Sequence, residues 1–127
     1  MKKSLWNDLM RRARHLATDK AALGVVVQKA KLKAFEHKGS LSKFWQELMA
    51  LLRLLKAWST GKYPKVPWKT MLGIIAGVLY FLNPFDIIPD FISVVGFLDD
   101  ASVIAFVYQS AKKDIHKFLE WEKSATY

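Results

Sequence analysis

Four aspartates stand close together in the second half of the chain, at Asp86, Asp90, Asp99 and Asp100. Carboxylate oxygens are the ligands that Mg²⁺ and Ca²⁺ prefer, so these side chains form a candidate cation site, although their spacing matches no EF-hand loop. Carboxylates at a helix start also accept backbone N–H bonds and lie at the positive end of the helix dipole. We expect helix capping here and keep two alternatives, the cation site and an ion pair with a basic side chain.

Histidines and cysteines give no further site. The chain has no cysteine, which excludes disulfides and thiolate zinc sites. The three histidines, His15, His37 and His116, lie far apart and show no metal-ligand spacing. The sequence contains no nucleophile elbow, phosphate-binding loop or zinc-binding helix motif. We therefore expect a protein that is not an enzyme and that uses no cofactor.

The formal net charge of +9 is unevenly distributed along the chain. Residues 1–69 hold 16 Lys and Arg against 4 Asp and Glu, residues 70–111 hold none against 4, and residues 112–127 hold 4 against 3. Cationic flanks around a cation-free, apolar centre fit the positive-inside tendency if both flanks are cytoplasmic. The N-terminus lacks the sustained apolar stretch of a secretory signal. We expect a protein of the cytoplasmic membrane, integral or peripheral, with both termini on the cytoplasmic side.

The N-terminal segment 4–17 predicts a basic amphipathic helix with its apolar residues on one face. Such a helix can lie in a membrane interface, where its cations meet anionic headgroups. The residues expected at a membrane surface are Lys2, Lys3, Trp6, Arg11, Arg12 and Arg14. The alternative is a surface helix whose apolar face covers the protein core.

Two further helices are predicted in the first half of the chain. One spans 20–36 after a cap at Asp19. Its exposed side is expected to hold Lys29, Lys33 and Glu36. The other spans 41–58 and carries a wide apolar face that needs a large partner. Gly61 and two prolines then mark a linker that ends before residue 68.

The second half predicts a helical hairpin of 68–82 and 99–122, joined by the acidic, proline-containing segment. The helix over 68–82 is apolar around its whole circumference, so it must be buried in protein or in lipid. Its length is roughly 22 Å, which is short of the ~30 Å hydrocarbon core of a bilayer. Whether the hairpin spans the membrane, enters it or packs as a protein core stays open at this point.

These elements predict an all-α protein of about five helices in one structural domain. A basic amphipathic region covers residues 1–61, and the hairpin region covers residues 62–127. The length of 127 residues is typical of one domain.

The run over 66–103 resembles the YkvA-like family, a bacterial domain of unknown function. The motif is Pro-x-Asp-x-Ile-Pro-Asp-Phe-Ile followed by Gly-x-x-Asp-Asp. Its residues here are Asn83, Pro84, Asp86, Pro89, Asp90, Gly96, Asp99 and Asp100. Asn83 stands where many members have Ser, and both residues can cap a helix. The resemblance implies membrane association and no established activity.

The sequence thus predicts a non-enzymatic, membrane-associated protein, with an adaptor or interaction role. Its expected partners are the lipid bilayer or an anionic membrane surface, and a protein bound through the apolar helix faces. The alternative is a soluble basic helical protein that binds nucleic acid or an acidic partner, because the pI is about 9.8. The absence of a nucleic-acid reader motif argues against the nucleic-acid version. The oligomeric state is not determined by these patterns.

Overall fold

The computed structural model describes residues 3–39, 41–82 and 99–126, and every regular element within these ranges is a helix. The all-α prediction is therefore confirmed. The elements are α1 (Lys3–Thr18), α2 (Lys20–Glu36), the short 3₁₀-helix η1 (Ser42–Phe44), α3 (Trp45–Ser59), α4 (Trp68–Leu82), α7 (Asp99–Ser110) and α8 (Lys112–Thr126).

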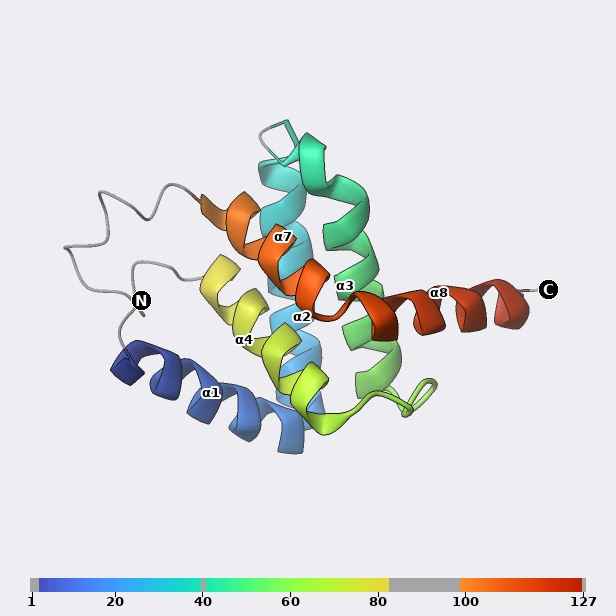
Figure 1. Ribbon diagram of the computed structural model, residues 1–127, viewed down its shortest axis with the longest axis horizontal. Coiled ribbons are helices and arrows are strands. Elements are labelled where there is room, and N and C mark those ends of the chain that lie inside the picture. The colour runs from blue at the N-terminus through green and yellow to red at the C-terminus, as the bar shows by residue number, and fades with distance from the viewer. Residues whose placement is uncertain (1–2, 40, 83–98, 127) are drawn as a thin grey trace.

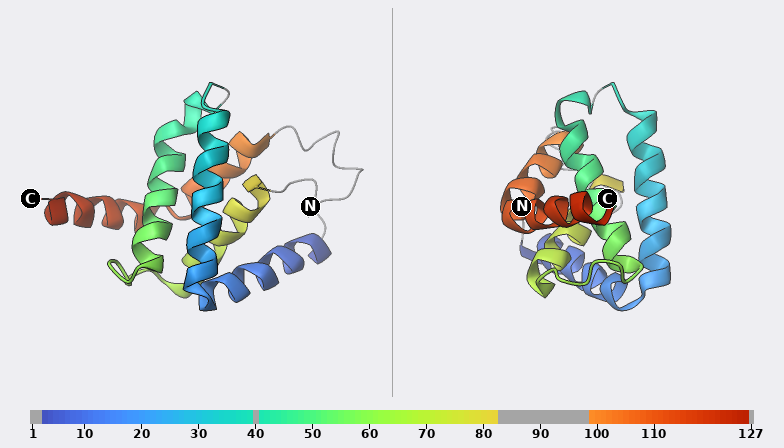
Figure 2. Two further views of the ribbon diagram at one scale, coloured as in Figure 1. Left: turned by 180° about the vertical axis from the view of Figure 1, so that it is seen from behind. Right: turned by 90° about the vertical axis from the view of Figure 1, so that its right-hand side faces the viewer.

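Helix α4 lies at the centre of the arrangement (Figure 1). It contacts α1 along one side and α7 along another, and it also packs against α2 and α3. Helices α2 and α3 lie next to each other as an antiparallel pair, with α2 at one edge of the molecule (Figure 2). This arrangement buries most of α4 between Met71 and Phe81, as the apolar sequence of that stretch requires.

The core extends from the first helix to the last. Leu9 of α1, Leu23 of α2, Leu55 of α3, Ile75 of α4 and Phe118 of α8 all belong to one hydrophobic cluster. The basic first half and the apolar second half of the sequence therefore share this core. In the described parts of the chain, no helix combines the length and the apolar content needed to cross a membrane.

Local signals explain several helix ends. Asp19 caps α2 by accepting a hydrogen bond from the Ala22 backbone N–H at 3.1 Å, as predicted. Gly61 follows the end of α3 with a φ of 80°, a conformation that glycine adopts without steric cost. The N–H of Lys62 donates to the carbonyl of Ala57, and the N–H of Gly61 donates to that of Trp58. This pattern is a Schellman motif, which ends α3 before the linker.

Two predicted helices differ from the structure. The helix expected over 41–58 begins instead with the 3₁₀ turn η1, and α3 starts at Trp45. The helix expected over 99–122 is broken at Ala111 into α7 and α8, which run in different directions (Figure 1). The turn lets Ile115 and Phe118 become buried beside α3. Among the described residues there are thus six α-helices and one 3₁₀-helix, where five helices were expected.

Candidate functional site

The acidic motif is flanked by α4 and α7. Its residues Asn83, Pro84, Asp86, Pro89, Asp90 and Gly96 lie outside the described residues. Helix α7 begins at Asp99, which places Asp99 and Asp100 in its first turn. An acidic residue in a first helical turn lies near the positive end of the helix dipole, so helix capping stays our prediction for these two acids. The proposed cation site stays a prediction, and within the described residues no group of three His, Asp or Glu side chains could hold a metal ion.

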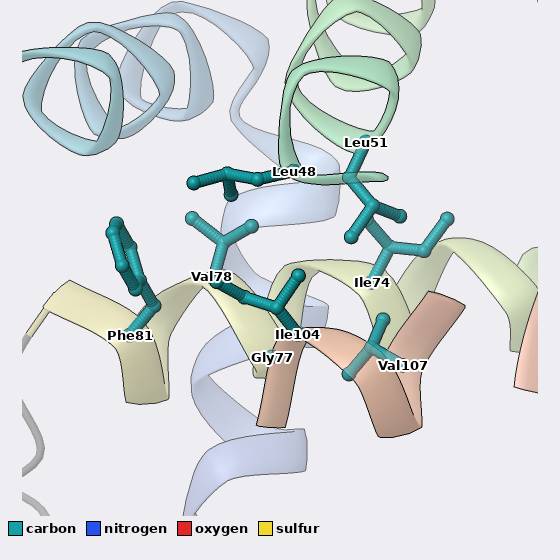
Figure 3. Close-up of a pocket in the computed structure, with 8 residues that line it drawn as sticks. All are labelled: Leu48, Leu51, Ile74, Gly77, Val78, Phe81, Ile104 and Val107. Atoms are coloured by element: carbon teal, nitrogen blue, oxygen red, sulfur yellow. The ribbon is translucent and has the colours of Figure 1, made fainter. Parts of the chain in front are cut away.

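The two helices that flank the motif, α4 and α7, approach each other closely at Gly77. A Cβ atom added to Gly77 would lie 2.5 Å from Cγ2 of Val107, closer than real Cβ contacts allow. Figure 3 shows Gly77 beside Val107, where the two helices meet under α3. Glycine at this position therefore lets α7 pack directly on the backbone of α4.

A small cavity of about 10 Å³ lies at the same junction, lined by apolar side chains of α3, α4 and α7 (Figure 3). Leu48, Ile74, Phe81 and Ile104 belong to its lining. A volume near 10–15 Å³ holds about one water molecule, and a water needs polar partners that this lining does not offer. The cavity is thus a packing gap and gives no binding site for a small molecule.

Lys33 of α2 reaches the end of α4 immediately before the motif. Its Nζ donates hydrogen bonds to the carbonyls of Phe81 and Leu82 and lies 4.9 Å from the centre of the Phe81 ring. A cation at a helix C-terminus stabilises the free carbonyls and the negative end of the dipole. The sequence interpretation placed Lys33 on the exposed side of α2, which is wrong. The side chain is partly buried because it points across to α4, a contact that spans 48 positions in sequence.

The residues expected at a membrane surface lie on or before α1. Arg11, Arg12 and Arg14 are exposed, and Arg11 forms an exposed ion pair of 2.9 Å with Asp8. Lys2 lies outside the described residues, and the side chains of Lys3 and Trp6 are not described. The apolar face of this helix is engaged, since it contributes buried residues to the core against α4. These are Leu9, Ala13 and Ala17.

The structure reveals an apolar surface that the sequence interpretation missed. Val25, Leu32 and Phe35 are 55%, 66% and 51% exposed, and together they form what we call the α2 outer stripe. The opposite face of α2 is buried through Leu23 and Val27, among others. A helical projection of residues 20–36 contains the signal, because it places large apolar residues on two opposite faces.

The end of the stripe is held in place by an aromatic pair. The Phe35 ring meets the Trp45 ring edge to face, with 5.2 Å between the ring centroids. The ammonium group of Lys38 lies 5.9 Å from the Phe35 centroid and 5.2 Å from the Trp45 centroid. An exposed apolar side chain and a cation thus share one end of the helix, which suits a surface that is partly apolar and partly anionic.

At the other end of α4, a polar contact and an aromatic cluster hold α8. Thr70 donates a hydrogen bond of 2.8 Å to Asp114. The buried Tyr63 packs on Phe118 and Trp121, with centroid distances of 5.3 and 5.0 Å. Burial, and secondarily the negative charge of Asp114, raise the pKa of the Tyr63 phenol above its usual value. This cluster fixes α8 against the linker that follows α3.

Comparison with known proteins gives two matches. A family model described as "Protein of unknown function (DUF1232)" matches residues 70–106, which run from the first turn of α4 into α7. The chain is also 36% identical over 99 residues to the "Uncharacterized membrane protein YkvA" of Bacillus subtilis (strain 168). That alignment covers 78% of this chain and 90% of the relative. No solved structure matches the chain.

Proposed function

The chain belongs to the YkvA-like family, and from that premise we propose that it associates with the cytoplasmic membrane of a bacterium and acts there by binding, without catalysing a reaction. The observation that carries the proposal is the relative of 36% identity, which is named a membrane protein and is covered over 90% of its length. An adaptor or interaction role is the form of binding that we favour, with lipid and a protein as the two partners.

The distribution of exposed charge supports contact with a membrane surface. The cations Arg11, Arg12 and Arg14 of α1 are exposed. Cationic side chains near an anionic leaflet contribute about 1 kcal/mol each to binding. Most described apolar residues of α1 and α4, by contrast, already pack within the protein core, although Trp68 at the start of α4 is 48% exposed. We therefore propose that the protein first contacts the bilayer through side chains that are already exposed, while its core stays packed.

Vesicle flotation tests the proposal. Full-length protein is mixed with vesicles of phosphatidylcholine alone, or of phosphatidylcholine and phosphatidylglycerol in equal parts, and in parallel with duplex DNA. We expect flotation with the anionic vesicles. Release at high salt indicates surface attachment, because salt screens headgroup attraction, and retention indicates insertion of apolar groups. Binding to DNA with no flotation at either salt concentration would favour the nucleic-acid alternative and refute the proposal.

The proposed topology places both termini in the cytoplasm. Because the chain has no cysteine, Ser4→Cys and Thr126→Cys each introduce a unique thiol. We expect both thiols to be protected from a membrane-impermeant reagent in intact cells and to react after the membrane is opened. Labelling of either position from outside intact cells would contradict this topology.

A further inference from the structure

We infer that the α2 outer stripe is the surface through which this protein docks on a bilayer carrying anionic headgroups. This inference rests on the proposed membrane association and names the part of the molecule that performs it. Val25, Leu32 and Phe35 recur at spacings of seven and three residues, so they share one face of the helix. All three are more than half exposed.

The packing of α2 into the core depends mainly on its opposite face. Leu23, Val27, Ala30 and Ala34 pack that face into the core. An amphipathic surface helix normally presents polar side chains on the side away from the core. Large apolar side chains gathered on that side indicate a surface that meets another apolar phase.

The charges beside the stripe indicate that the apolar phase is a bilayer with anionic headgroups. Lys29 and Lys31 flank the stripe on its two sides, and Lys38 lies at its C-terminal end beside Phe35, all of them exposed. Five lysines and one acidic residue stand between positions 20 and 38; the acidic residue, Glu36, is exposed and lies one turn after Leu32. Lysine stems can lie along apolar surface while their ammonium groups reach outward to phosphate. An apolar stripe with lysines on both sides fits the boundary between acyl chains and anionic headgroups.

A second copy of this chain fits the stripe less well. Symmetric pairing of two α2 helices would bring lysines towards lysines in a protein of net charge +9. Three side chains also provide little area beside the roughly 1,200–2,000 Å² that stable protein interfaces bury. A membrane surface needs only shallow contact, and its negative charge complements the lysines.

The first experiment compares two exposed apolar sites. The double variant Leu32→Ser, Phe35→Ser should lose at least about tenfold in partition onto vesicles of phosphatidylcholine and phosphatidylglycerol, because its apolar contact is removed. The control is Phe106→Ser on α7. Phe106 is 68% exposed but lies outside the stripe, so this variant should partition like the wild type. Phe106→Ser should keep the wild-type melting temperature, whereas the double variant should melt somewhat lower because it loses the contact of Phe35 with Trp45. Partition is therefore compared at a temperature at which circular dichroism shows both variants folded.

The second experiment compares two sets of lysines of equal charge. Replacing Lys29, Lys31 and Lys38 by Gln should weaken binding to the anionic vesicles several-fold more than replacing Lys56, Lys62 and Lys65 by Gln. All six lysines are exposed, so both variants lose three charges from the surface. Equal losses would mean that net charge alone attracts the protein to the vesicle, which would overturn the inference.

A third measurement locates the stripe directly. Leu32→Cys provides a unique thiol for an environment-sensitive fluorophore, whose emission should shift to the blue on vesicle binding. The same label at Phe106→Cys should shift little. If wild-type protein floats but the label at position 32 does not respond, or the serine double variant binds normally, the stripe is not the docking surface and membrane association stands. If wild-type protein does not float, the proposed function itself fails. A concentration-dependent dimer that the serine double variant abolishes, with unchanged flotation, would assign the stripe to a second copy.

Discussion

Gly77 is the residue at which a single methyl group has the clearest predicted effect. Gly77→Ala places a Cβ 2.5 Å from Val107 Cγ2, so α4 and α7 must move apart or Val107 must rotate. Overpacking of this kind costs about 1–3 kcal/mol, and alanine recovers about 0.5–1 kcal/mol through its better helix propensity. We expect a net loss of about 1 kcal/mol in the free energy of unfolding, measured by urea denaturation.

Two matched variants control this prediction. A Cβ at Gly73, one turn earlier in α4, meets no atom within 4 Å, so Gly73→Ala should be neutral or stabilising. In a Val107→Ala background the clash is removed, and Gly77→Ala should then no longer destabilise. A destabilisation of the same size in both backgrounds would show that the Val107 contact is not the cause.

Tyr63 gives the protein a predicted sensitivity to alkaline pH. Its pKa is raised by burial and, to a smaller extent, by Asp114, so the folded state holds the phenolic proton more tightly than the unfolded state does. The resulting stability is present below the unfolded pKa of about 10 and is lost as pH rises through the higher folded pKa. We expect Tyr63→Phe, which keeps the ring against Phe118 and Trp121, to lose less stability than wild type above pH 10.

The measurement is urea denaturation across the alkaline range, with tyrosinate absorbance recorded in parallel. The wild-type spectrum should contain a late-ionising phenol that is missing from the Tyr63→Phe variant. Identical alkaline stability profiles for the two proteins would contradict the link between Tyr63 burial and stability.

Single residues also show where sequence reasoning stopped. The cap at Asp19 was predicted because its hydrogen bond to Ala22 is local. Lys33 was misplaced because its partners, the carbonyls of Phe81 and Leu82, lie almost fifty positions away in sequence. Composition and periodicity carry no information about such a contact.

The start of α7 is the element whose chemistry is most open to test. Asp99 lies in the first turn of this helix. If the acid only stabilises the helix start, Asp99→Asn should cost a few tenths of a kcal/mol and Asp99→Ala about 1 kcal/mol. Thermal melts of both variants, with and without added Mg²⁺ or Ca²⁺, measure the effect.

The same melts separate the alternatives. A cation site would give a wild-type melting temperature that rises with the metal, through mass action, and a response that Asp99→Asn abolishes. An ion pair with a buried cation would make Asp99→Asn cost about 3–5 kcal/mol without any metal dependence. We expect neither result at Asp99.

At the scale of elements, the helices with clear sequence signals were predicted with the correct bounds, and the break between α7 and α8 depends on tertiary packing. The bounds of α2 and α4 match their predicted ranges, because Asp19 marks one start and the uninterrupted apolar run marks the other helix. The break at Ala111 was not predicted, since the sequence has no glycine or proline there. The chain turns there because Ile115 and Phe118 are buried beside α3, and this requirement exists only in the folded protein.

At the scale of the whole molecule, the sequence segments that differ in charge occupy different positions in the fold. The cation-free centre supplies α7 and all of α4 except Trp68 and Lys69, and the basic first half supplies α1, α2 and α3, which pack around α4. The apolar surplus of the sequence is thus largely used in the core. What remains exposed includes the α2 outer stripe; periodicity places apolar residues on two opposite faces of this helix but does not say which face is buried.

The packing of α1, α2, α3 and α7 around α4 limits how fast α4 could reach the acyl chains of a bilayer (Figure 2). For α4 to reach acyl chains, α1 and α7 would first have to detach, and such opening has the large activation enthalpy of unfolding, with rates that rise about 3–6-fold per 10 °C. Docking through the outside of α2 requires no detachment, so its association rate follows diffusion and changes little with temperature. The temperature dependence of vesicle association in stopped flow therefore reports whether the fold stays closed on the membrane.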